Sequence, residues 1–152
     1  MRWKIQPMTL ADFEAVFRLW QNTEGIGLGE SDTRPGIAGY LKRNPGMSFV
    51  ARCGTEVIGA VLCGHDGRRG YLHHLAVARA FRKQGLGSAL VQACLERLAA
   101  LGIPKCNLFL FADNADGEAF WRHTGWATRA DLAVMQRALP PERGAGSVRR
   151  ET

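Results

Sequence analysis

Apolar positions along the chain recur with two different periods, which predict helices and strands. A helical period near the N-terminus is shared by Leu10, Phe13, Val16, Phe17 and Trp20. Thr9 begins this segment, and Asp12 three residues later resembles a capping box. A second helix is predicted over about residues 86–101, where Gly102 and Pro104 end it and the buried face comprises Leu86, Leu90, Cys94, Leu98 and Leu101.

Shorter apolar runs predict the strands. Residues 47–53 and 57–65 flank a turn at 54–56, and a further turn leads into a run at 71–77. The continuous apolar run 106–111 is typical of a buried strand, and a final strand is predicted over Leu132 to Leu139. Short helices are expected at 36–43 and 116–123, and residues 22–35 form a loop. This order indicates an α/β fold with one mixed sheet.

Length and composition restrict the class of protein. The 152 residues suit one domain, and 46% apolar with 22% charged residues is close to the globular average. We expect a single domain over residues 1–139 and a disordered tail over 140–152, which has little to bury. No apolar run approaches the ~20 residues of a membrane span, and the N-terminus lacks a secretory pattern, so a cytoplasmic location is expected.

The net charge and the cysteine spacing do little to narrow the function class. Four cysteines lie far apart without a C-x-x-C pair, which favours reduced core thiols over a metal site or a disulfide. The formal net charge of +6 attracts polyanions in general, from nucleic acids to phosphorylated cofactors. Arg and Lys are scattered, and no recognition helix or RNA motif is present, so nucleic-acid binding is not favoured.

The most informative segment joins the strand at 71–77 to the helix at 86. It is basic and contains glycine, and it delivers the chain to a helix start, where unpaired N–H groups and the helix dipole attract phosphate. Gly85 and Gly87 allow close approach of the backbone, while Arg82 and Lys83 add positive charge. A Walker A loop is excluded because no Gly-Lys-Ser/Thr ending is present, and the dinucleotide fingerprint is excluded because Leu90 replaces its third glycine.

Two motifs in this chain resemble those of the GCN5-related N-acetyltransferase (GNAT) family. Arg82-x-x-Gly85-x-Gly87 resembles the family's R/Q-x-x-G-x-G/A signature, with Phe81 before it. A second motif, roughly N-x-x-A-x-x-F-Y-x-x-x-G-F in the family, is matched at its spacing by Asn114, Gly117, Phe120, Trp121, Gly125 and Trp126. The resemblance covers about residues 1–139. It implies a mostly antiparallel central sheet flanked by helices, in which the fourth and fifth strands splay apart.

The resemblance also implies a cosubstrate, acetyl-coenzyme A, bound in that splay, and no metal. Backbone groups of Leu75 and Val77 would pair with the pantetheine arm, N–H groups from Arg82 or Lys83 to Ser88 would hold the pyrophosphate, and Asn114 would bond the arm. The complete predicted cofactor site comprises Leu75, Ala76, Val77, Arg82, Lys83, Gln84, Gly85, Leu86, Gly87, Ser88, Asn114, Phe120 and Trp121. Family members usually transfer the acetyl group directly to an amine, and the N–H of Leu75 is the predicted oxyanion donor.

The chain departs from the family at its usual general acid, a tyrosine, which is replaced by Trp121. An indole N–H is no practical acid. Releasing a thiolate of pKa ~8.5 at pH 7 costs about 2 kcal/mol, which slows the reaction by ~30-fold without stopping it. A non-catalytic domain that binds coenzyme A, as a sensor or interaction module, is therefore an alternative to the enzyme.

A general base is not obvious in the sequence. His73 is the first candidate and Glu24 a weaker one, with Glu30 and Asp32 in the same loop. His73 and His74 are expected on opposite faces of the strand, because side chains alternate. Weak base assistance favours an α-amine or another amine of low pKa over a lysine side chain. The acceptor itself, the use of longer acyl chains and the oligomeric state, with a homodimer as one option, stay open.

Overall fold

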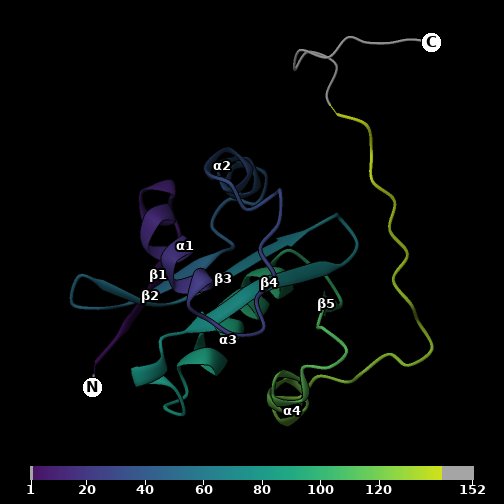
Figure 1. Ribbon diagram of the computed structural model, residues 1–152. Coiled ribbons are helices and arrows are strands. Elements are labelled where there is room, and N and C mark those ends of the chain that lie inside the picture. Colours follow the sequence, from purple (N-terminus) through teal and green to yellow (C-terminus); the bar gives the residue numbers. More distant parts are fainter. Residues whose placement is uncertain (1, 142–152) are drawn as a thin grey trace.

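Five strands form one sheet in the order β1-β2-β3-β4-β5, in a computed structural model that describes residues 2–141 (Figure 1). The strands are β1 (Lys4–Pro7), β2 (Phe49–Cys53), β3 (Glu56–His65), β4 (Gly70–Val77) and β5 (Cys106–Leu108). Neighbours are antiparallel except β4 and β5, which are parallel. The mixed, mostly antiparallel sheet predicted from the sequence is confirmed. The short strand β1 was not among the predicted elements.

Helices cover both faces of the sheet (Figure 1). On one face, α1 (Phe13–Gln21) and α2 (Arg34–Arg43) enclose a cluster that includes Val16, Trp20 and Ile37. On the other face, α3 (Leu86–Ala100) packs Leu86, Leu90, Cys94 and Leu98 against the sheet. The remaining elements are α4 (Ala115–His123) and two 3₁₀ turns, η1 (Leu10–Asp12) and η2 (Arg79–Phe81). Apolar side chains of β2 and β3 point alternately into the two clusters, so both helical layers pack against the same strands.

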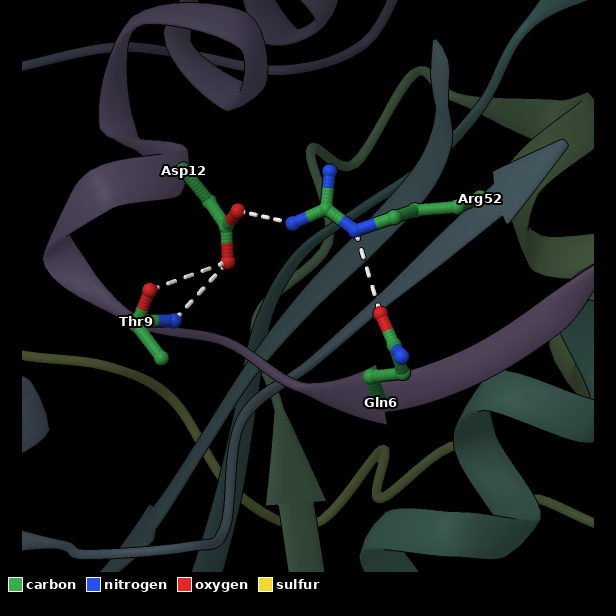
Figure 2. A network of polar contacts seen from close by, with 4 residues as sticks. All are labelled: Gln6, Thr9, Asp12 and Arg52. Atoms are coloured by element: carbon green, nitrogen blue, oxygen red, sulfur yellow. Dashed lines mark hydrogen bonds and ion pairs between the residues drawn. The ribbon is translucent and has the colours of Figure 1, made fainter. Parts of the chain in front are cut away.

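The predicted capping box is present and also ties the first helix to the sheet (Figure 2). The N–H of Thr9 donates to Asp12 Oδ2 over 2.9 Å. Asp12 is buried and forms an ion pair with Arg52 of β2, whose Nε donates to Gln6 Oε1 of β1 over 3.1 Å. Since a buried carboxylate needs partners, this network fixes η1 over the β1–β2 edge, and α1 follows it at Phe13.

Three predictions near the ends of elements are wrong. Leu101 is 57% exposed, because it lies at the C-cap of α3, where the chain leaves the helical path. The strand predicted as buried over 106–111 ends at Leu108, and Phe109 and Phe111 are exposed, because β4 offers no partner beyond Leu72. Residues 132–139 form no strand; they extend away from the sheet (Figure 1), where no neighbouring strand supplies hydrogen bonds.

The predicted tail lies almost entirely beyond residues 2–141, the described part of the chain. Of the tail 140–152, residues 142–152 lie outside the described residues. Within 2–141, no helix has the length and hydropathy needed to cross a bilayer. The same residues contain no group of three or more His, Cys, Asp or Glu side chains placed to hold a metal ion.

Candidate functional site

Strand β4 is paired on both sides over only part of its length. Its parallel pairing with β5 consists of Gly70 with Cys106, Tyr71 with Asn107 and Leu72 with Leu108. Beyond Leu72 the two strands part, so residues 73–77 have β3 on one side and, among residues 2–141, no strand on the other. The splay expected of the fourth and fifth strands is therefore present. Backbone groups along this free edge can pair with an extended ligand, as a further strand would.

A β-bulge interrupts β4 at the start of this free edge. Leu62 of β3 pairs with His73 and Ala60 pairs with Ala76, so two β4 residues, His74 and Leu75, lie opposite one β3 residue. His74 has φ +56°, a conformation that few residues other than glycine adopt. The prediction that His73 and His74 point to opposite faces is wrong, because the extra residue breaks the alternation. The His73 ring lies 6.1 Å from that of Tyr40, and the His74 ring 4.9 Å from that of Trp20, so both face α1 and α2.

The bulge orients one peptide group out of the sheet ladder. The carbonyl of His74 accepts a hydrogen bond of 2.9 Å from Nε1 of Trp20, which is buried in α1. The C=O and N–H of one trans peptide point in opposite directions, so the N–H of Leu75 points away from Trp20. Leu75 has no partner residue in the β3 register. This N–H, predicted as the oxyanion donor, is thus turned out of the regular pairing by a contact from α1.

The side chain of His74 is paired with Asp32 of the loop between α1 and α2. His74 Nε2 lies 3.0 Å from Asp32 Oδ1, while Asp32 Oδ2 accepts from the N–H of Gly29 over 2.8 Å. The side chains of His74 and Asp32 are 18% and 11% exposed, so solvent still reaches them. Both residues were named from the sequence, but their pairing was not predicted. No local signal joins residues 42 positions apart, and only the fold brings them together.

His73, the predicted base, lies among aromatic rings instead. Its ring is 6.1 Å from Tyr40, 6.5 Å from Tyr71 and 6.4 Å from Phe109. Burial lowers the pKa of His73, and the neighbouring His74 lowers it further. Since a lowered pKa makes a weaker proton acceptor, these surroundings do not favour His73 as the base.

The turn before α3 presents its backbone N–H groups in a concave arrangement. Lys83 and Gly85 have φ of +62° and +83°, and Gly85 is the N-cap of α3. Residues of positive φ between residues of negative φ direct successive N–H groups inward, which makes an anion-binding nest. In the described part of the chain, no acceptor pairs with the N–H groups of Leu86, Gly87 or Ser88. The turn therefore offers unpaired N–H groups to an anion, and the pyrophosphate site that the sequence motif indicates stays a prediction.

The two glycines of the motif do different things. A Cβ on Gly85 would meet no atom within 4 Å, so it is the positive φ that requires glycine there. A Cβ on Gly87 would lie 3.4 Å from the ring of Phe120 and 3.7 Å from Val77. Gly87 thus permits α4 to approach α3 and the end of β4. This places Phe120 beside the turn formed by residues 82–88, which is called the phosphate turn below after the predicted pyrophosphate site.

Arg82 is already paired in this structure. Its Nε donates to the carbonyl of Val77 over 2.9 Å and a terminal nitrogen donates to Glu24 Oε1 over 2.9 Å. Arg79 lies 3.7 Å from the other Glu24 oxygen. The hydrogen bond from Arg82 is the main cause that lowers the pKa of Glu24 to about 2. A carboxylate held so strongly in its charged form is a poor base, so the structure does not favour the catalytic role predicted for Glu24.

The second motif forms α4 and its packing against the core. Asn114 is the N-cap of α4, and its Oδ1 accepts from the N–H of Gly117 over 2.9 Å. Trp121 lies 5.1 Å from Trp126 and 5.0 Å from Phe120, ring centre to ring centre, and packs against the cluster under α3. Trp121 therefore has a packing role of its own, and the bond predicted from Asn114 to the cofactor arm stays a prediction.

Comparison with known proteins agrees with this geometry. Residues 13–126 match the acetyltransferase (GNAT) family. An acetyltransferase of Pectobacterium atrosepticum is 35% identical over 68% of this chain and 72% of its own length. One of Yersinia enterocolitica is 32% identical over 90% of this chain and 96% of its own. In the solved structure of the PaiA N-acetyltransferase from Thermoplasma acidophilum in complex with coenzyme A, 92% of that chain superposes on 85% of this one, with a TM-score of 0.76 and 16% identity.

The solved structure supports the fold. The family match and the curated relatives also indicate the reaction, which is acetyl transfer. Both relatives are named acetyltransferases, which favours the enzyme over the non-catalytic alternative. The free edge of β4 and the phosphate turn fit acetyl-coenzyme A as the acetyl donor. This chain therefore belongs to the GNAT family and is an acetyltransferase that uses acetyl-coenzyme A.

Proposed function

We propose that this enzyme acetylates a primary amine of low pKa by direct attack on acetyl-coenzyme A in a ternary complex. The observation that carries the proposal is the His74–Leu75 peptide, turned out of the sheet at the start of the free β4 edge. A thioester carbonyl placed against the Leu75 N–H would have its developing oxyanion stabilised there. The pantetheine arm would lie along residues 75–77 and the pyrophosphate on the turn from Arg82 to Ser88.

The leaving thiolate needs no dedicated acid. Trp121 stands where the family has a tyrosine, and its packing with Trp126 supports a structural role. At pH 7 a thiol of pKa ~8.5 leaves as thiolate at a cost of about 2 kcal/mol. The proton that the attacking nitrogen must still lose can pass to this thiolate, which completes the transfer without a further protein group.

The acceptor class follows from the free energy of deprotonation. A lysine amine of pKa ~10.4 costs about 4.6 kcal/mol to deprotonate at pH 7, while an α-amine near ~7.8 costs about 1 kcal/mol. The acidic loop residues Glu24 and Asp32 are paired with Arg82 and His74, which leaves less free negative charge for a lysine-like cation than the sequence suggests. We therefore expect small or peptide α-amines to be acetylated faster than lysine side chains.

A panel of amines with acetyl-coenzyme A, with released thiol as the readout, tests the acceptor. Activity on α-amines should exceed activity on lysine analogues at pH 7. Preferential acetylation of lysine analogues would contradict the acceptor class. Thiol release with no amine in the panel would contradict the proposal as a whole.

Calorimetry with coenzyme A tests the binding site. Gly85→Val should abolish or strongly weaken binding, because a branched residue at φ +83° disrupts the phosphate turn. Gly67→Val is the matched control: Gly67 also has positive φ and open surroundings, and it lies in the turn before β4. Unchanged affinity in a folded Gly85→Val protein would remove this site from the proposal.

A homodimer is a further part of the proposal, supported by exposed apolar residues. Phe109 and Phe111 follow β5, and Leu132, Val134, Met135 and Leu139 lie on the extended segment, all exposed. Exposed apolar groups beside an edge strand favour association. Light scattering should give twice the chain mass of 16.7 kDa, and the combined change Val134→Asp and Met135→Asp should give the single mass. A monomer in the unchanged protein would contradict this part.

A further inference from the structure

We infer that His74, held by Asp32, takes the proton from the acceptor ammonium before the amine attacks. The inference rests on the proposed function and adds to it the residue that performs the first step. Three observations support it: the His74–Asp32 pair, the position of His74 directly before Leu75, and the bulge that turns the ring toward α1 and α2.

The His74–Asp32 pair determines which nitrogen of the imidazole can accept a proton. A carboxylate only accepts hydrogen bonds, so the imidazole Nε2 that faces Asp32 carries the hydrogen. Nδ1 then carries the lone pair, and no hydrogen bond to it occurs within residues 2–141. Asp32 in turn is held by the N–H of Gly29, so its own orientation is fixed. This arrangement leaves one basic nitrogen on a ring that solvent still reaches.

The surroundings distinguish His74 from the other titratable groups of this face. His73 lies 6.4 Å from the His74 ring but among three aromatic rings, and burial lowers its pKa. Tyr40, whose pKa burial raises, contacts His73 from α2, and Trp20 of α1 is uncharged. Asp32 is therefore the anion paired with His74. His74 Nε2 lies 3.0 Å from Oδ1 of that carboxylate, which holds the ring in one orientation.

The backbone is strained at this residue, which also points to function. A φ of +56° is unfavourable for histidine by about 1 kcal/mol or more. It persists because both ends of His74 are fixed, the carbonyl by Trp20 and the ring by Asp32. The same bulge that frees the Leu75 N–H therefore places a basic nitrogen one residue away from it.

The step balances without another reactant. The ammonium R–NH₃⁺ gives one proton to Nδ1 and becomes R–NH₂, while His74 becomes imidazolium. The nitrogen lone pair forms the C–N bond to the thioester carbon, and the C–S bond breaks with its electron pair leaving on sulfur. The new amide nitrogen gives its second proton to the thiolate, and the imidazolium returns its proton to solvent.

The test uses His74→Asn, because asparagine tolerates positive φ and keeps the bulge while removing the base. With an α-amine acceptor, kcat/KM at pH 6.5 should fall by about 100-fold, within the range for loss of a general base. The loss should shrink to within about threefold at pH 9, since the acceptor, of pKa ~7.8, is then already deprotonated. Asp32→Asn should show the same trend with a smaller loss, and Glu30→Gln, an exposed carboxylate of the same loop, should show none.

Each alternative has its own result. A loss that is equal at pH 6.5 and 9 would overturn the inference, because His74 would then act only by shaping the bulge. Unchanged activity of His74→Asn would overturn it as well. If His73→Ala instead gives the pH-dependent loss, the base is the neighbouring residue. Failure of the proposed function looks different: the unchanged enzyme would bind coenzyme A in the calorimeter yet release no thiol with any amine.

Discussion

The two halves of β4 differ in what satisfies their backbone. Residues 70–72 pair with β3 on one side and β5 on the other, and Leu72 is buried under α3. Residues 73–77 pair with β3 alone, through a bulge, and leave one edge free. A fully paired strand has no backbone groups left for a ligand. One strand therefore combines a fully paired segment and a free edge, and the change occurs after Leu72.

The free half is held by side chains in place of a strand. The indole of Trp20 fixes the His74 carbonyl, Asp32 fixes the His74 ring, and Arg82 bonds the carbonyl of Val77. These contacts come from α1, from the loop after it and from the phosphate turn. The geometry of the site thus depends on tertiary contacts, whereas the first half depends on regular pairing and core packing. Changes in the two halves should consequently separate activity from stability.

Among changes outside β4 itself, the largest effect is expected from Trp20→Phe. The variant keeps a buried ring but loses the bond to the His74 carbonyl, so the Leu75 N–H is no longer held in position. We expect kcat to fall by about 10- to 100-fold, somewhat less than the loss of an oxyanion donor outright. The fall should be equal at pH 6.5 and 9, because no proton acceptor is removed. Steady-state thiol release at the two pH values measures it.

A control for packing is available in the same helix. Val16 is buried beside Trp20 in the same cluster and bonds no part of β4. Val16→Ala should lower the melting temperature about as much as Trp20→Phe and leave kcat within about twofold, because only packing is lost. If both variants lose kcat equally, general loosening of α1, and not the indole bond, controls the site.

The next effect concerns the paired half and should appear in stability alone. A Cβ on Gly70 would lie 2.5 Å from Cδ1 of Leu98, which is buried in α3. Gly70→Val should therefore lower the free energy of unfolding by about 1–3 kcal/mol through overpacking, with a fall of about 2–4 °C in melting temperature per kcal/mol. The kcat of the folded variant should be unchanged. Chemical denaturation and thiol release measure the two quantities.

A double-mutant cycle separates overpacking from a general effect on the strand. Leu98→Ala removes the side chain that the valine introduced by Gly70→Val would meet. The combined variant should then be less destabilised than the sum of the two single changes, because residues in contact couple. Additive losses would mean that contact with Leu98 is not the reason for glycine at this position.

The sequence predicts the locally determined elements well and the bulge in the free half poorly, for a physical reason. Helix and strand periods are local properties, and so is the turn chemistry of Lys83 and Gly85, which made α3, the hairpin β2–β3 and the phosphate turn predictable. The bulge at His74 depends on Trp20 and Asp32, which are 54 and 42 residues away. Strict alternation therefore placed His73 and His74 on opposite faces, and the pair with Asp32 was not predicted.

The strand predicted over residues 132–139 is wrong because a local pattern does not specify a partner strand. Leu132 and Val134 alternate as in a strand, but a strand also needs a neighbour whose position no local pattern specifies. Burial was likewise wrong for Phe109 and Phe111, since an apolar run does not reveal where its partner strand ends. Pairing, and not propensity, decides these segments.

A smaller effect is expected from His73, at the boundary between the halves. Burial, with a contribution from His74, lowers the pKa of His73 below its ordinary value near ~6.5. The unfolded chain then binds a proton more readily than the folded one, so stability is complete above about pH 6.5 and is lost as the pH falls below it. His73→Phe should flatten the decline in melting temperature between pH 7 and 5. His123→Gln, an exposed histidine of α4, should leave that decline unchanged.

The smallest effect is expected from Glu24→Gln, at the far end of the free half. Glu24 neutralises Arg82 and Arg79, and with its pKa lowered to about 2 it stays charged at every working pH. A pyrophosphate on the turn must share these guanidinium groups with the Glu24 carboxylate. Removing the carboxylate's charge leaves them to the phosphates, while the bond to the Val77 carbonyl keeps Arg82 in place. We expect coenzyme A to bind about two- to fivefold more tightly, as befits an exposed ion pair, and the gain to shrink at high salt. Calorimetry at two salt concentrations measures it, and Glu118→Gln, which breaks the exposed pair with Arg122 in α4, should change nothing. Weaker binding by Glu24→Gln would reverse the interpretation, because Glu24 would then orient Arg82 for the phosphates instead of competing with them.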